Sequence, residues 1–293
     1  MTIQGRITHL ATLLLGIATL ALAAPRTFAA APDPERAAID AVLERSGLLA
    51  EPITASGETR LGAQRISHEL RAGTPLVRVA YGPADPAGRP SEATVTVQRW
   101  ITGVLEIRQS DARGRDHVVR KDVRDSCVRQ VTLRRMRTAD DPIAVTWRVT
   151  TVSPWVGQTP QGKAVLPLVD LDTHAVSSGF LSVLSNLDEL AVYPQTCAVT
   201  APGDSVRVLV GGLDADAAVC VFAGSQRVGA RRSDDSHAVA MVKLDRAGLS
   251  EIGVTVYSGR TLSDASAPAD SRTWVMPILV GSPPPPSQEW FAL

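Results

Sequence analysis

The pattern of apolar and polar residues changes its period along the chain. After Asp33-Pro34, a pair that suits the first turn of a helix, apolar residues recur at helical spacing as far as Gly47. Within residues 75–149 the period becomes two, with apolar residues alternating with polar neighbours. Half-buried strands of an antiparallel sheet show this alternation. The pattern therefore predicts a helix followed by an antiparallel sheet with one solvated face.

Turn residues divide the alternating region into short segments. The expected strands cover residues 77–81, 93–97, 104–107, 117–123, 128–136, 143–149 and 164–171. Thr102-Gly103 is typical of a turn, so the segments on either side of it are expected to be separate strands. Residues 59–71 fit neither period, and residues 176–187 have the spacing of a short helix. We interpret residues 33–195 as an α+β domain built on an antiparallel sheet.

The next part of the chain, residues 197–281, is more regular. Its alternating segments are residues 206–210, 218–222, 238–244, 252–256 and 274–280. So many short strands within about 80 residues are typical of a β-sandwich. The expected fold class is mainly β, with the α+β domain followed by this sandwich.

Several stretches of this second part resemble bacterial immunoglobulin-like modules. They are APGDSV at residues 201–206, GGLD at 211–214, AAV at 217–219, RAG at 246–248 and IGVTV at 252–256. Such modules combine a glycine-marked first hairpin with a late strand of alternating valines. The resemblance implies an immunoglobulin-like sandwich with a mechanical or binding role, and it carries over no catalytic residues.

The first 30 residues have the features of a secretory signal. Arg6 precedes an apolar run of about fifteen residues, shorter than the roughly 20 needed to span a bilayer, and small residues follow it. Cleavage after Ala29 and cleavage after Ala23 both fit. We expect an exported protein, periplasmic or extracellular, without a stable membrane span.

The last residues, 282–293, form a proline-rich tail that ends in Trp290 and Phe291. Consecutive prolines favour an extended spacer. The apolar tip is a candidate docking element for a protein or surface partner, and the alternative is that it packs back on the parent domain.

Composition and charge narrow the classes of function. Apolar residues make up 44% and charged residues 20% of the chain, which is normal for a packed protein, and the formal net charge is zero. The stretch 113–137 holds nine basic and three acidic residues. Arg120, Lys121, Arg134 and Arg135 are therefore candidate polyanion contacts, and the alternative is the solvated face of two adjacent strands. Aromatic residues for base stacking are missing there, so nucleic acid is not expected.

The three cysteines are Cys127, Cys197 and Cys220. In an oxidising compartment two of them can pair, and spacing alone does not choose the pair. We favour Cys197 with Cys220, which fall in the same predicted domain on different strands, and this leaves Cys127 as a buried thiol.

The best candidate for chemistry is Asp170-Leu171-Asp172-Thr173-His174. Residues two apart on a strand face the same side, so Asp170, Asp172 and His174 are candidates for a metal or acid–base site. The alternative is a strand end at which Asp172 caps the next helix. We expect no cofactor. Calcium is left open at these carboxylates and at Asp214 and Asp216, for which the alternative is a hairpin turn that favours aspartate.

The sequence favours a non-enzymatic binding or envelope-associated protein with an immunoglobulin-like scaffold domain. A secreted hydrolase using the carboxylate and histidine site is the first alternative. An accessory subunit of a surface-assembly or secretion apparatus is the second.

Overall fold

The computed structural model describes residues 33–52, 54–110, 115–137, 145–160, 162–164, 168–173, 181–183 and 199–281. The chain divides into two units, residues 1–37 and residues 38–293. All the strands belong to the second unit.

Helix α1 (Pro34–Arg45) begins where the sequence predicts it. The backbone N–H of Glu35 donates to the carboxylate of Asp33 at 3.0 Å, which caps the first turn. Gly47 ends the helical segment with φ at +68°, a conformation that costs glycine little. Neither helix of the described residues has the length and apolar character needed to cross a bilayer.

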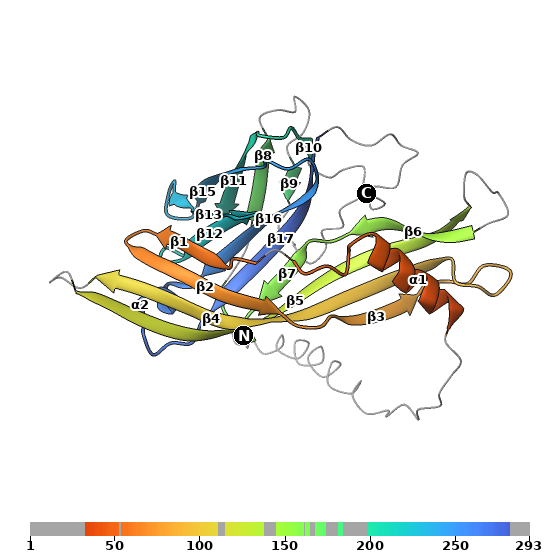
Figure 1. Ribbon diagram of the computed structural model, residues 1–293, viewed down its shortest axis with the longest axis horizontal. Helices are drawn as coiled ribbons and strands as arrows, with labels where there is room; N and C mark the ends of the chain where they lie inside the picture. Colours follow the sequence, from red (N-terminus) through yellow and green to blue (C-terminus); the bar gives the residue numbers. More distant parts are fainter. Residues whose placement is uncertain are drawn as a thin grey trace, which may run out of the picture. The chain divides into compact units, whose positions relative to one another are not determined.

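Most of the described chain forms one twelve-stranded sheet, called here the large sheet (Figure 1). Its strands are β1 (Gly57–Leu61), β2 (Gln64–Ala72), β3 (Leu76–Tyr81), β4 (Glu92–Ser110), β5 (Asp116–Arg137), β6 (Val145–Val152), β7 (Trp155–Gln158), β10 (Val199–Thr200), β12 (Ala218–Ala223), β13 (Gln226–Gly229), β16 (Gly248–Tyr257) and β17 (Ser271–Val280). The order is β1-β2-β4-β5-β7-β17-β16-β12-β13, with β3 beside β4, β6 beside β5 and β10 beside β17. Only the β10–β17 pair is parallel among the described strands.

The two ends of this order, β1 and β13, approach each other, so the large sheet is nearly closed. The Thr59 hydroxyl on β1 donates to the Arg227 carbonyl on β13 at 3.4 Å. A side chain at Gly229 of β13 would overlap the carbonyl of Arg60, so the two backbones pass close together. No backbone ladder joins the two strands in the part of the chain that the structure describes.

A second, five-stranded sheet packs on one face of β12, β16 and β17. Its strands, in order, are β14 (Arg231–Arg232), β15 (Ala238–Lys243), β11 (Ser205–Gly211), β8 (Leu168–Thr173) and β9 (Leu181–Val183). Val208 of this small sheet shares a buried cluster with Val221 and Val254 of the large sheet. Phe222 and Tyr257 belong to a different cluster, inside the large sheet. The strands β12 and β16 are therefore buried on both faces.

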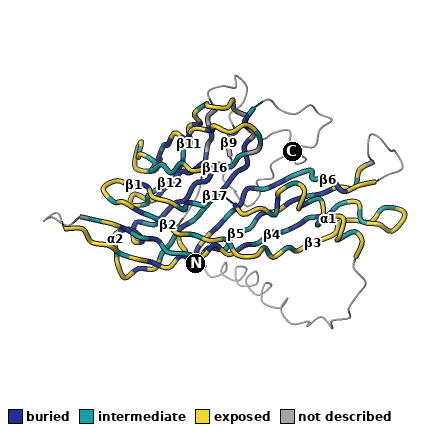
Figure 2. Tube along the Cα trace, viewed as in Figure 1, coloured by how far each residue is buried: buried dark blue, intermediate teal, exposed yellow. Residues whose placement is uncertain are grey.

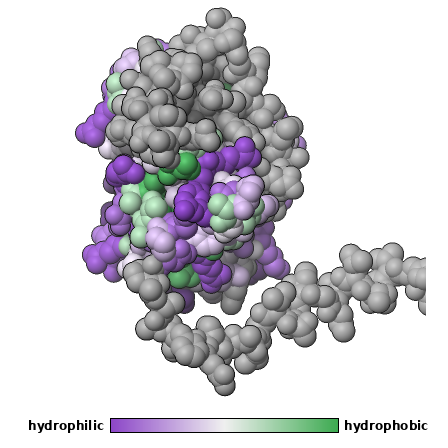
Figure 3. Space-filling view, turned by 90° about the vertical axis from the view of Figure 1, so that its right-hand side faces the viewer, coloured by the Kyte–Doolittle hydropathy of each residue, from purple (hydrophilic) through white to green (hydrophobic). Residues whose placement is uncertain are grey.

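The inner face of the large sheet is largely apolar along the two long strands, although Arg99, Lys121, Asp125 and Arg129 are also buried there. On β4 and β5 the odd-numbered residues are buried for most of their length and the even-numbered ones are more exposed, as strand alternation requires. Figure 2 shows buried positions concentrated along β4, β5, β16 and β17. Ile39 and Leu43 of α1 are fully buried in the same inner cluster. Figure 3, which shows the side where α1, β3 and β6 lie, has mostly hydrophilic residues among those described.

Three local predictions are wrong. The strands expected separately at residues 117–123 and 128–136 are one continuous strand, β5. The turn expected at Thr102-Gly103 is the middle of β4, where Gly103 lies opposite Leu70 of β2. Any side chain at Gly103 would overlap the carbonyl of Glu69, so this glycine permits a close approach of two strands and not a reversal. The helix expected over residues 176–187 is a strand, β9, at the three positions described there.

The large sheet also crosses the boundary expected near residue 196. Trp274 of β17 lies opposite Val156 of β7, which is not one of the strands expected from the sequence. The small sheet likewise pairs β8 with β11. An immunoglobulin-like sandwich of residues 197–281 is therefore not confirmed, because strands of that segment complete a sheet begun earlier in the chain. The mainly β class and the antiparallel sheet are confirmed.

Candidate functional site

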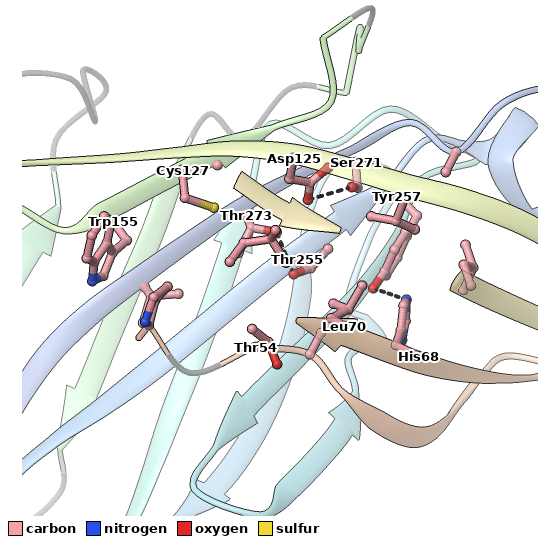
Figure 4. A pocket seen from close by; sticks show the side chains of 18 residues that line it. Thr54, His68, Leu70, Asp125, Cys127, Trp155, Thr255, Tyr257, Ser271 and Thr273 are labelled. Carbon is pink, nitrogen blue, oxygen red and sulfur yellow. Dashed lines mark hydrogen bonds between the residues drawn. The ribbon is translucent and has the colours of Figure 1, made fainter. Parts of the chain in front are cut away.

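A cavity lies inside the large sheet, among β2, β4, β5, β7, β16 and β17 (Figure 4). The space open to the centre of a water molecule is about 30 Å³, which is room for about two waters. The apolar part of the wall includes Leu70, Ile101, Leu105, Val123 and Val275.

Strand alternation places the polar part of the wall. His68 and Leu70 are two apart on β2, and Thr255 and Tyr257 are two apart on β16. Residues two apart on a strand point to the same face, so both side chains of each pair point toward the cavity. Asp125 and Cys127 on β5, and Ser271 and Thr273 on β17, line it in the same way.

His68 and Tyr257 form a buried pair. The Tyr257 hydroxyl and His68 Nε2 share a hydrogen bond of 2.9 Å, and the two rings stack with centroids 5.5 Å apart. Burial, helped by the positive charge of Arg227, lowers the pKa of His68 to about 4. Burial raises the pKa of Tyr257 well above its ordinary value. Both rings are thus uncharged at neutral pH, and His68 Nδ1 has no partner among the described residues.

Asp125 is a carboxyl group on the apolar face of β5, and its residue is only 5% exposed. Its Oδ2 accepts a long hydrogen bond of 3.5 Å from the Ser271 hydroxyl, and its Oδ1 has no described partner. Burial raises the pKa of Asp125 to about 7; the Ser271 hydrogen bond opposes this and the charge of Asp270 adds to it. Below that pH the group both donates and accepts hydrogen bonds.

Trp155 forms one end of the cavity wall (Figure 4). The guanidinium of Arg129 lies over its ring, 4.7 Å from the centroid, and bonds to Glu251 at 3.1 Å. This fixes the indole, whose Nε1 has no partner among the described residues. On the neighbouring strands, the hydroxyls of Thr255 and Thr273 bond to each other at 2.8 Å.

The arrangement is suited to binding and poorly suited to nucleophilic chemistry. Burial, with the charge of Asp125, raises the pKa of the Cys127 thiol to about 12, so it stays protonated at neutral pH. The Ser271 hydroxyl faces a carboxyl group, and His68 is bonded to Tyr257. A buried polar atom without a partner costs about 1–3 kcal/mol. His68 Nδ1, Asp125 Oδ1 and Trp155 Nε1 are three such atoms, and all three belong to residues that line the cavity.

No family model, curated protein or solved structure matches this chain. What the cavity holds is therefore inferred from its own residues.

Two of the three predicted metal or acid–base residues lie on a strand of the small sheet. Asp170 and Asp172 lie on β8 in the small sheet, opposite Leu209 and Arg207 of β11. His174 lies outside the described residues, within which no group of three or more metal-binding side chains occurs. The joint role of Asp170, Asp172 and His174, and calcium with it, stays a prediction.

The candidate polyanion contacts divide between the two faces of β5. Arg120 and Arg134 are exposed on the outer face, where they pair with acids of β4, Glu106 at 2.6 Å and Glu92 at 3.1 Å. Lys121 is buried on the other face of β5, so its side chain is not at the surface where a polyanion would bind. Arg135 is only half-exposed. The Lys121 ammonium donates to two backbone carbonyls that follow the short helix α2 (Gly259–Ser263).

The remaining candidates lie partly outside the described residues. Cys220 is a buried free cysteine on β12, so the structure does not show its expected disulfide; the partner, Cys197, is not among the described residues. Cys127 is a buried free cysteine, as expected. Trp290 and Phe291, the candidate docking residues, also lie outside the described part of the chain.

Sequence reasoning missed His68, Asp125 and Tyr257. One signal was present for Asp125, which occupies an inward position between Val123 and Cys127 in an alternating segment. A carboxyl group between two apolar residues on an inward strand face indicates a buried polar site. His68 gave a weaker signal, because residues 59–71 showed no clear period.

Proposed function

We propose that this chain is an exported, non-enzymatic binding protein whose ligand is a small apolar molecule with one uncharged hydrogen-bonding group. The observation that carries the proposal is the pair of unpartnered buried atoms, Asp125 Oδ1 and His68 Nδ1, in a cavity whose wall is otherwise largely apolar. Apolar sites with a few convergent polar groups are typical of small-molecule binding. The features of residues 1–30 support export.

The state of charge of the cavity decides the class of ligand. His68 is neutral at neutral pH, and the raised pKa of Asp125, about 7, keeps part of that carboxyl population uncharged there. A charged ligand would lose its hydration without gaining a permanent counter-ion. An alcohol, phenol or amide instead exchanges a hydrogen bond to water for one to Asp125 or His68.

1-Hexanol is the probe that tests this proposal, with hexanoate of the same chain length as the charged comparison. At pH 6.5 we expect hexanol to bind at least about tenfold more tightly than hexanoate, a difference of about 1.4 kcal/mol. Titration followed by the NMR shifts of methyl groups in Ile101, Leu105 and Val275 reports binding at the site. Asp125→Leu should weaken hexanol binding about tenfold, since a hydrogen bond to a charged or strongly polar group is worth about 1.5–3 kcal/mol.

Asp122→Leu is the matched control, because Asp122 lies three residues away on the exposed face of the same strand. It should leave hexanol affinity unchanged. Equal affinity in the Asp125→Leu and wild-type proteins would contradict the proposal. So would a cavity that holds water alone, recognised by methyl shifts that do not move with hexanol.

A further inference from the structure

The cavity as it stands is too small for the ligand that its chemistry suits. Its space for water centres, about 30 Å³, is far below the roughly 300 Å³ of even small ligand sites. One part of the wall must therefore move when a molecule enters. All six lining strands, β2, β4, β5, β7, β16 and β17, are held by ladders to a neighbour on each side in the order of the large sheet.

The wall segment Thr54–Ser56 is held differently. Thr54 and Ala55 line the cavity, and the segment lies just before β1 without belonging to a strand. On one side Ser56 is tied to β2, because its hydroxyl accepts from the Leu70 backbone N–H at 3.1 Å. On the other side it faces β13 across the seam where the large sheet has no described ladder.

Besides the Thr59 hydrogen bond described above, the side chain of Arg227 makes two hydrogen bonds across that seam. Nε of Arg227 on β13 donates to the Ser56 carbonyl at 2.8 Å, and Nη2 donates to the Thr54 carbonyl at 2.6 Å. Nη1 binds back to its own hairpin, at the Gly224 and Gln226 carbonyls, at 2.8 and 2.6 Å. The guanidinium also lies over the Phe222 ring, 5.3 Å from its centroid. Arg227 therefore bridges the β12–β13 hairpin and the cavity wall.

We infer that Arg227 is a latch, and that ligand enters between β13 and Thr54–Ser56 when its two hydrogen bonds to that segment break. The inference rests on the proposed function. Ser56 keeps the segment attached to β2 while the β13 side opens. The latch is also coupled to the binding groups, because the charge of Arg227 helps to hold His68 in its neutral form.

Arg227→Lys tests the latch, because lysine keeps the charge but lacks the fork that holds two carbonyls at once. The probe is 6,6,6-trifluoro-1-hexanol, with its exchange between free and bound forms followed by ¹⁹F NMR. We expect both the association and the dissociation rate to rise about tenfold while Kd changes by less than about threefold, since the latch touches the path and not the bound molecule.

Arg232→Lys is the matched control. Arg232 also donates to several backbone carbonyls, those of Asp214, Ala217 and Asp235, and none of these residues lines the cavity. Its exchange rates should equal those of the wild-type protein. Unchanged rates in Arg227→Lys, with the probe still bound, overturn the latch and leave the proposed function standing. Absence of any bound probe in the wild-type protein overturns the proposed function itself.

Hydrogen exchange in the unaltered protein gives a test that no folding defect can obscure. Amides of β1 and β13 are expected to exchange faster than those at the centre of the β4–β5 pair, and to slow when trifluorohexanol is bound. Protection at the seam that does not respond to the bound probe would contradict the latch.

Discussion

The free energy of unfolding of the Asp125→Asn variant, taken relative to that of the wild-type protein, is expected to increase by about 4 kcal/mol as the pH rises from 4 to 8. In the folded wild-type protein the pKa of Asp125 is about 7, against an ordinary value of 3.8. Between these values the folded state holds a proton that the unfolded state has released, so stability is lost as pH rises. Each pKa unit corresponds to about 1.4 kcal/mol, and asparagine removes the whole dependence.

His68→Gln should change the pH dependence of the free energy of unfolding in the opposite direction. Burial holds the pKa of His68 at about 4, below its ordinary 6.5, so the unfolded state binds the extra proton between these values. The stability that His68 contributes is present above pH 6.5 and is lost as pH falls toward 4. The free energy of unfolding of the His68→Gln variant, taken relative to that of the wild-type protein, should therefore decrease by about 3 kcal/mol as the pH rises from 4 to 6.5. In the wild-type protein the two slopes largely cancel.

Urea unfolding followed by tryptophan fluorescence, at half-unit steps from pH 4 to pH 8, measures both differences. Asp122→Asn, on the exposed face of the same strand, should give a profile parallel to that of the wild-type protein. If the Asp125→Asn and His68→Gln profiles also run parallel to it, neither group is buried in the way described.

The second large effect is expected at the contact between Phe222 and Gly253. The two residues lie opposite each other on β12 and β16, and a methyl group on Gly253 would overlap the Phe222 ring. Phe222 is fully buried, so Phe222→Ala should cost about 3–5 kcal/mol. Gly253→Ala should cost about 1–3 kcal/mol by overpacking.

In the double variant the new methyl group enters space that the ring has vacated. The combined loss should therefore be about 1–2 kcal/mol smaller than the sum of the two single losses. Chemical denaturation of the four proteins completes the cycle. Gly103→Ala is the control, because it overlaps a backbone carbonyl of β2; its cost should be the same with and without Phe222. Strict additivity for Gly253 would show that the ring does not rest on this glycine.

The local features of the fold were predictable because they depend on neighbouring residues. Asp33 marks the start of α1, and the alternation in β3, β4 and β5 records which face is buried. What failed depends on distant partners. Gly103 has the same local signature whether the chain turns or another strand approaches closely, and only the position of Glu69 decides between these two. The Thr102-Gly103 turn was therefore a reasonable prediction and a wrong one.

The candidate site was harder to predict for the same reason. His68 and Tyr257 are 189 residues apart in sequence, and nothing local to either indicates the other. The boundary near residue 196 was inferred from a change in regularity, whereas the pairing of β7 with β17 depends on two segments that neither period nor composition connects. Of His68, Asp125 and Tyr257, only Asp125 gave a clear local signal, a charge in an inward position of an alternating segment.

The two-faced burial of β12 and β16 has a consequence for the order of folding. A ribosome or an export channel delivers β2, β4, β5 and β7 well before β16 and β17, so the early strands wait with an open edge at β7. Pairing of residues as far apart in sequence as these is slow and leaves unpaired edges exposed to aggregation. Once β17 arrives, its neighbour β16 becomes the common wall of two apolar layers. A chain that ends before residue 271 has no β17 to hold β16 in place, so neither of the two apolar layers that pack on β16 can form completely. We expect such a chain to bind chaperones that hold unfolded proteins.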